Sequence, residues 1–333
     1  MILSGLLASA SGLVVLVGQG ATIDAKADAA LAAELGASRR VVLAVGAPES
    51  APDPFAGGAP ADARIAIDPA APRSGDERRT AESALGAGCI VLTGGDVSDW
   101  SKILIPGGST TRLSEAIRDA QRGGASVVGV GAAAPFLAQW CTVEFATLGK
   151  AERNPRHVRA DVGVGGLGLF DELLVDSSAC PRGEPMRALR AAFDGNHGTL
   201  LFLEGPVVFV GDPKSRSARI FGTGTALVFD FSAGRRTRDA WREGRLALLT
   251  GGDSWSARAG AACAAPSLEI DAAKVGGPWD DPRGRALSDA LGRGTARLSI
   301  HVDERTRLRA ASVASPGSAS GLAFDLTWGP SGS

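Results

Sequence analysis

The sequence predicts an α/β protein of three layers, in which a mostly parallel, doubly wound sheet lies between helices. The first observation is a series of short runs that are apolar along their whole length, as expected of strands buried on both faces. The second is the alternation of these runs with stretches of amphipathic helical period. Ligands of such sheets bind at the carboxyl ends of the strands, so the turns after the apolar runs are the candidate sites.

The first half of the chain alternates strands with helices. Residues 46–80 interrupt the pattern with many Pro, Ala, Gly and Asp residues, and we expect a long surface excursion there. Strands are predicted at 13–17, 40–45, 64–67, 89–92 and 126–130, and helices at 24–35, 78–85 and 111–122.

The second half is richer in strands. Apolar runs follow one another with short turns between them, and after residue 232 the composition shifts toward Arg, Ala and Gly. We therefore expect an α/β domain over residues 1–233 and a C-terminal extension over 234–333, of mixed and partly irregular structure. Strands are predicted at 173–175, 200–203, 207–210, around Ile220, and at 226–229, 296–301 and 322–327.

Charge and hydropathy exclude two classes of partner. The chain has 35 Lys and Arg against 36 Asp and Glu, so no basic excess is available for a nucleic-acid backbone. No apolar run approaches the roughly 20 residues that span a bilayer. The first 23 residues are uncharged, but Lys26 is the first basic residue and Ser and Gly break the apolar stretch, which is untypical of a signal peptide. We expect a cytoplasmic protein.

The residues that bind metals and cofactors show none of the required spacings. Cysteines occur without a C-x-x-C pair and histidines without an i,i+4 pair, so we expect no metal. The run 163–168 matches G-x-G-x-x-G, but no clear strand precedes it and no helix follows it. We therefore expect no cofactor.

The turn after residues 126–130 carries the most information about function. In α/β hydrolytic enzymes a strand of this kind leads through a strained turn, which presents a Ser or Cys nucleophile, into a helix. Here the central residue of the turn is Gly131. On the same pattern, a helix after the turn would carry Cys141 about three turns along it.

Several segments, taken in order, resemble the cyanophycinase and peptidase E family of serine peptidases. The resemblance covers residues 12–232 and implies a class I glutamine amidotransferase-like fold, without a cofactor. The matching segments are Thr93-Gly94-Gly95-Asp96, residues 127–134, Asn154-Pro155-Arg156, residues 166–169 leading to Val175-Asp176, Arg182-Gly183, and residues 204–230 with Gly222-Thr223-Gly224.

The resemblance also implies which catalytic groups are missing. It places Gly131 at the nucleophile, Ser178 at the histidine and Glu152 at the acid of the triad. A hydroxyl needs a base to accept its proton, so a chain without the serine and the histidine has no triad catalysis. The residues that the resemblance assigns to the substrate pocket are Thr93, Gly94, Gly95, Asp96, Asp176 and Arg182. Val97 and Glu184 depart from the family pattern, which has Gln and Arg there.

Three functions remain open from the sequence. The first is a catalytically degenerate, cyanophycinase-like homologue that binds an aspartyl or arginyl peptide. The second is an active peptide hydrolase with a relocated nucleophile, for which Cys180 and the pair Ser177 and Ser178 are the candidates. The third is a structural or interaction protein. A homodimer is expected from the resemblance alone.

Two candidate residues also have a purely structural interpretation. Asp96 follows two glycines at a strand end, where an Asp typically caps the next segment through backbone N–H groups. His157 lies in a polar stretch rich in Arg, which is typical of a surface loop.

Overall fold

The structure is a computed structural model of the whole chain. It describes residues 12–18, 20–21, 35, 39–46, 54–55, 61–71, 73–141, 165–177, 188, 191–193, 195–232, 234–237, 240–249, 251–256, 260–262, 297–301, 307–312 and 322–327. The predicted helix at 24–35 lies outside these residues except for Leu35.

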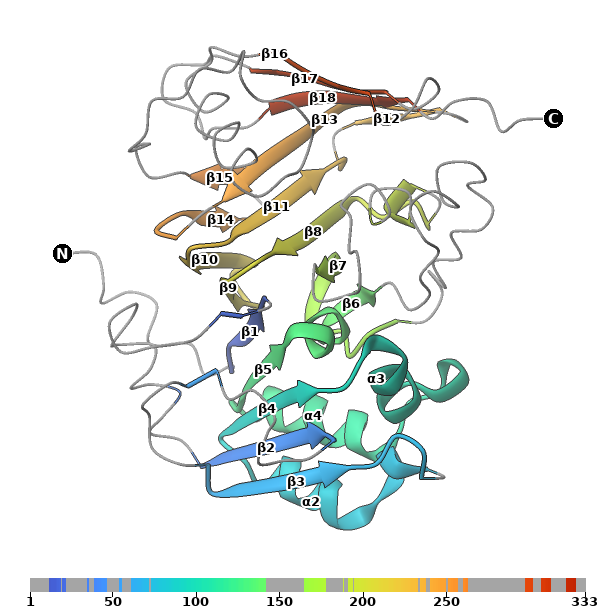
Figure 1. Cartoon of the computed structure of the whole chain (residues 1–333), viewed down its shortest axis with the longest axis vertical. Coiled ribbons are helices and arrows are strands. Elements are labelled where there is room, and N and C mark those ends of the chain that lie inside the picture. Colours follow the sequence, from blue (N-terminus) through green and yellow to red (C-terminus); the bar gives the residue numbers. More distant parts are fainter. Residues whose placement is uncertain are drawn as a thin grey trace.

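Parallel strands form the centre of the first sheet, which we call sheet A (Figure 1). Each of them is an apolar run that the sequence predicts, and three of them are buried along their whole length. This confirms the predicted α/β class. In spatial order the strands are β1 (Val14–Val17), β5 (Ser126–Val130), β4 (Cys89–Gly94), β2 (Arg40–Val45) and β3 (Ala63–Ile67).

Helices cover one face of this parallel part. They are α2 (Arg78–Leu85), α3 (Val97–Leu104) and α4 (Arg112–Arg122), with 3-10 turns η1 (Ser74–Asp76) and η2 (Pro106–Gly108) between them. Alternate strand residues such as Val14 and Leu16 pack toward the helices, while Val15 and Val17 pack with Leu35 and Phe55 on the opposite face. Both faces are therefore buried, as the uniformly apolar strands require.

Antiparallel strands extend sheet A beyond β1. The added strands are β9 (Val207–Asp212), β10 (Ser217–Gly222), β14 (Ser254–Ser256) and β15 (Gly260–Ala262).

A second sheet, sheet B, contains the remaining strands. Its parallel part consists of β6 (Ala138–Cys141), β7 (Phe170–Ser177) and β8 (Thr199–Glu204). Antiparallel pairing continues through β11 (Thr225–Asp230), β13 (Ala240–Leu249), β18 (Leu322–Thr327), β17 (Arg307–Ser312) and β16 (Arg297–His301), and β12 (Arg235–Arg236) pairs with β13.

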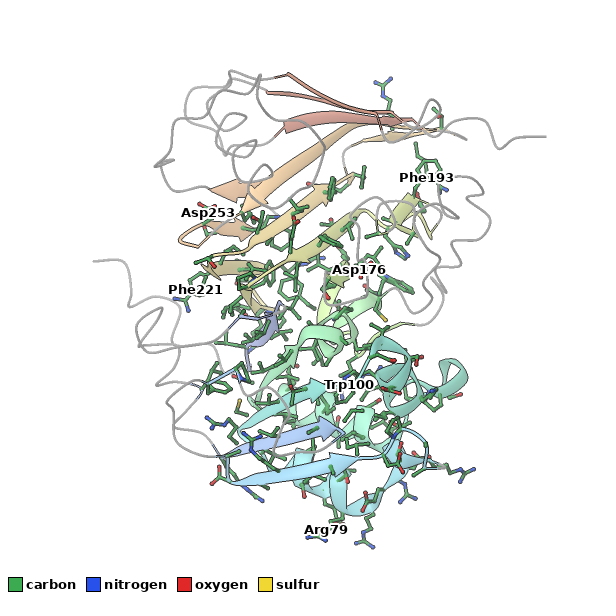
Figure 2. All side chains as sticks on the ribbon, viewed as in Figure 1. Arg79, Trp100, Asp176, Phe193, Phe221 and Asp253 are labelled. Carbon is green, nitrogen blue, oxygen red and sulfur yellow. The ribbon has the colours of Figure 1, made fainter. Side chains whose placement is uncertain are left out.

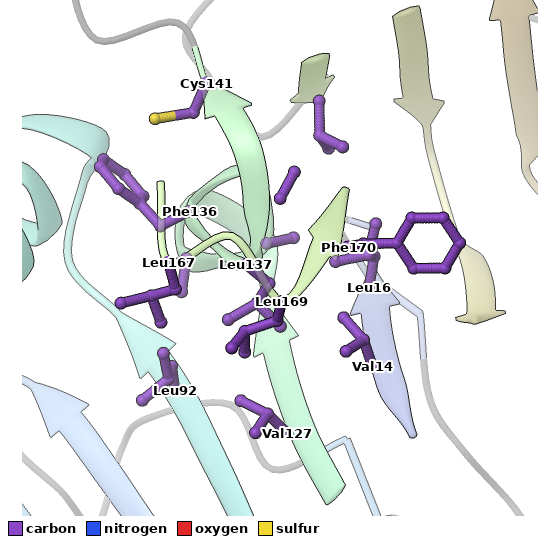
Figure 3. Packing of buried hydrophobic residues seen from close by; sticks show 14 of the residues in the cluster. Val14, Leu16, Leu92, Val127, Phe136, Leu137, Cys141, Leu167, Leu169 and Phe170 are labelled. Atoms are coloured by element: carbon purple, nitrogen blue, oxygen red, sulfur yellow. The ribbon is translucent and has the colours of Figure 1, made fainter. Parts of the chain in front are cut away.

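The two sheets and the helices share one hydrophobic core. Phe170 of β7 lies 6.0 Å from Phe209 of β9 and 6.2 Å from Trp255 of β14, measured between ring centroids. Figure 3 shows Phe170 beside Leu16, with Phe136, Leu137, Leu167 and Leu169 packed around the end of β5. No helix among the described residues is long and apolar enough to cross a membrane.

The segment after β5 differs from the expected helix. It forms a 3-10 turn, η3 (Gly131–Leu137), and then enters β6, so that Cys141 is the last residue of a strand and not part of a helix. Pro135 explains the short turn, because proline lacks the N–H of an α-helical hydrogen bond and clashes with the preceding turn. Trp140 and Cys141 instead pair in register with Leu174 and Val175 of β7.

Candidate functional site

Glycines occupy the carboxyl ends of four neighbouring strands of sheet A. Val17 pairs with Val130, Leu92 with Gly129 and Val45 with Gly94, so the residues that follow lie at the same edge. We call this set the glycine rim. Its members are Gly18 after β1, Gly46 after β2, Gly94 and Gly95 at the end of β4, and Gly131 after β5. The sequence predicts the residues on β4 and β5. It does not single out Gly46, although this glycine directly follows an apolar run.

The β4 end of the rim admits no larger residue. Gly94 and Gly95 have φ angles of +75° and +63°, a region that side chains disfavour. A Cβ on Gly94 would lie 2.4 Å from the carbonyl oxygen of Val45, and one on Gly95 would lie 2.6 Å from Val45 Cγ1. The close contact with β2 therefore explains both glycines.

Gly131 stands at the position that the resemblance assigns to the nucleophile. Its φ of +58° is left-handed and directly follows the last residue of β5. A Cβ on Gly129 would lie 2.8 Å from Ala134 Cα, so the turn folds back closely onto its own strand. The backbone thus makes a sharp left-handed turn after β5, as at a nucleophile elbow, but it continues into a 3-10 turn and a strand, and Gly131 provides no reactive side chain.

Asp96 caps the helix that follows the rim. Its Oδ1 accepts a hydrogen bond from Asp99 N at 2.9 Å, and its own N–H donates to Asp99 Oδ2 at 3.1 Å. This reciprocal pair starts α3 and confirms the structural interpretation of Asp96. Partial desolvation acts to raise the pKa of Asp96, but hydrogen bonds from Asp99 and Ser98 and the charge of Lys102 together lower it. The side chain is exposed and negatively charged at neutral pH.

A residue of α3, Trp100, also holds the end of β4 through one hydrogen bond. Trp100 is fully buried, and its Nε1–H donates to the carbonyl oxygen of Gly94 at 2.8 Å. Thr93, the preceding strand residue, is fully buried as well. Thr93 to Asp96 therefore form a corner in which Thr93 is enclosed and Gly95 and Asp96 are exposed, with the buried Trp100 bonded to its Gly94.

Asp176 belongs to sheet B, on the strand β7 (Figure 2). The turn between β8 and β9 connects the two sheets at the carboxyl end of β1, where Gly18 N donates to Val207 O at 2.7 Å. Because β7 runs parallel to β8 and Ser177 is level with Leu203, the carboxyl end of β7 faces the same side of the molecule as the glycine rim.

Asp176 and Ser177 are fully buried. The carboxylate of Asp176 accepts a hydrogen bond from Ser177 N at 2.8 Å. Ser177 Oγ has no hydrogen-bond partner among the described residues. Among the described residues Ser177 Oγ therefore has no base that could accept its proton, as an activated serine nucleophile requires.

His197 is the one histidine whose side chain the structure describes. Its ring is buried and lies 4.8 Å from the ring of Trp140, and burial lowers its pKa. Asp176 pairs with Phe202, five residues beyond His197, which corresponds to about 16 Å at the usual strand rise. His197 thus lies just before the amino end of β8 and Asp176 near the carboxyl end of the neighbouring β7, so they form no catalytic pair.

Other predicted site residues lie outside the described part of the chain. These are Ser178, Glu152 and Arg182, together with the alternative nucleophile Cys180 and the loop residue His157. Within the described residues no group of three or more His, Cys, Asp or Glu side chains could hold a metal ion.

No family model matches the chain, and no curated protein matches it. Among solved structures, a peptidase from an acI-B1 actinobacterium aligns with a TM-score of 0.48 and 16% sequence identity, over 74% of this chain and 97% of that chain. At this identity and TM-score the likeness carries no conclusion about activity.

Proposed function

We propose that this protein is a cyanophycinase-like peptidase homologue whose catalytic residues have degenerated, and that it binds an aspartyl or arginyl peptide at the glycine rim. One observation carries the proposal: β5 ends in a left-handed turn at Gly131, where a hydrolase of this architecture holds its nucleophile. The left-handed turn supports the proposal, and glycine provides no nucleophilic atom there.

The charge of the rim supports an arginyl ligand. Asp96 is exposed, and its lowered pKa keeps the carboxylate ionised at neutral pH. An exposed carboxylate can accept charge-assisted hydrogen bonds from a guanidinium group, in addition to the capping bond that Oδ1 of Asp96 accepts from Asp99 N. At Gly46 of the rim, the space that a Cβ would occupy is open.

Binding and cleavage of a β-aspartyl-arginine oligomer test the proposal together. We expect the purified protein to bind the fluorescently labelled oligomer, more weakly as salt rises, and to leave it uncleaved. Asp96→Asn should weaken binding while α3 stays folded, because Asn caps helices as well as Asp does. Asp119→Asn, an exposed carboxylate on α4, is the matched control and should bind normally. Cleavage of the oligomer by the wild type contradicts the proposal. So does a failure of both the wild type and Asp119→Asn to bind it.

Gly131→Ser should restore no hydrolysis, because the resemblance places Ser178 where the histidine base would be. The substituted serine would lie in the left-handed region at a cost on the order of 1 kcal/mol, so we expect the variant to fold. Peptidase assays of Gly131→Ser and of Gly131→Ser with Ser178→His check this. A trace of activity is expected from the double variant alone, and activity of the single variant would show that a base is already in place.

Active-site labelling distinguishes the proposed degenerate homologue from the alternative, an active hydrolase with a relocated nucleophile. Fluorophosphonate or iodoacetamide would modify Ser177, Ser178 or Cys180 stoichiometrically, with loss of a measured peptidase activity, if the alternative holds. Cys89 and Cys141 are buried and provide an internal control for unfolding, since iodoacetamide should not reach them in the native protein.

A further inference from the structure

We draw no further inference here: the strongest candidate, the buried imidazole of His197 beside the Trp140 ring where the chain enters β8, leaves Nε2 without a hydrogen-bond partner among the described residues, and nothing described there shows which ligand it would bind.

Discussion

At the scale of single residues, two buried serines show how hydrogen bonding decides the effect of a substitution. Ser114 on α4 and Ser177 on β7 are both fully buried. Ser114 Oγ donates to the carbonyl oxygen of Leu104 at 2.5 Å, whereas Ser177 Oγ has no partner among the described residues. An unsatisfied buried hydroxyl costs desolvation free energy that no hydrogen bond returns.

Replacing each serine by alanine should therefore have opposite consequences. Ser114→Ala should lower the unfolding free energy by about 1–2 kcal/mol, and Ser177→Ala should leave it unchanged or raise it. Urea titrations of the two variants beside the wild type measure the difference. An equal loss in both would mean that Ser177 Oγ has a partner, such as a bound water.

His197 should make stability depend on pH. Burial lowers its pKa, so between the lowered value and the unfolded value of about 6.5 the unfolded chain binds more protons than the folded chain. The free energy of unfolding is therefore unaffected by this titration above about pH 6.5. It decreases as the pH falls through that value toward the folded pKa.

The variant His197→Phe keeps an aromatic ring against Trp140 but cannot titrate. Between pH 7.5 and 5.5 the wild type should lose unfolding free energy relative to this variant, and urea midpoints at the two pH values measure the loss. Other titrating groups affect both proteins alike and cancel in the comparison. Parallel pH profiles would show that His197 does not change its protonation on unfolding.

At the scale of elements, α3 shows what sequence patterns capture and what they miss. The strands 40–45 and 126–130 and the helix 78–85 have the predicted bounds, because uniform burial or a clear helical period defines them. The eight-residue α3 was not predicted, although Asp96 and Asp99 have the spacing of a capping box. The helix expected after Gly131 is wrong: residues 138–141 form β6, because they pair with β7, which lies far along the chain.

Removing the cap of α3 should destabilise the corner of the glycine rim. Asp96→Ala should cost about 1 kcal/mol of unfolding free energy, because the N–H of Asp99 loses its acceptor and Asp99 alone cannot form the reciprocal pair. Asp96→Asn should cost little, since the amide oxygen accepts the same bond. Denaturant unfolding compares the two, and equal stabilities would show that the capping box does not hold α3.

The sequence predicts those parts of the candidate site that lie within one continuous segment of the chain. Thr93 to Asp96 and the turn at Gly131 follow strands that the sequence identifies, and the register places them at one edge. The distance between Asp176 and the rim depends on how two sheets pack, which no local pattern encodes. Glu152, Ser178 and Arg182 stay predictions, because they lie outside the described residues.

At the scale of the whole molecule, strands from the C-terminal third extend both sheets. β13 pairs with β11 in sheet B, and β14 pairs with β10 in sheet A. Trp255 of β14 is 6% exposed and lies 6.2 Å from both Phe170 and Phe209, measured between ring centroids. A residue after the expected boundary at 233 thus packs into the core that the helices share.

Trp255→Ala should therefore destabilise the α/β core and not merely its periphery. We expect a loss of about 3–5 kcal/mol in unfolding free energy, as for other large buried aromatic residues, and a smaller loss for Trp255→Phe, which keeps an aromatic ring. Leu85→Ala removes a side chain that is 54% exposed and should change little. Thermal unfolding, followed by the circular dichroism of the helices, shows whether β14 and the helices unfold together. A shared core couples β14 to α2, α3 and α4. If the helices of Trp255→Ala melt at the wild-type temperature, β14 belongs to a separately folding unit and the shared core does not act as one.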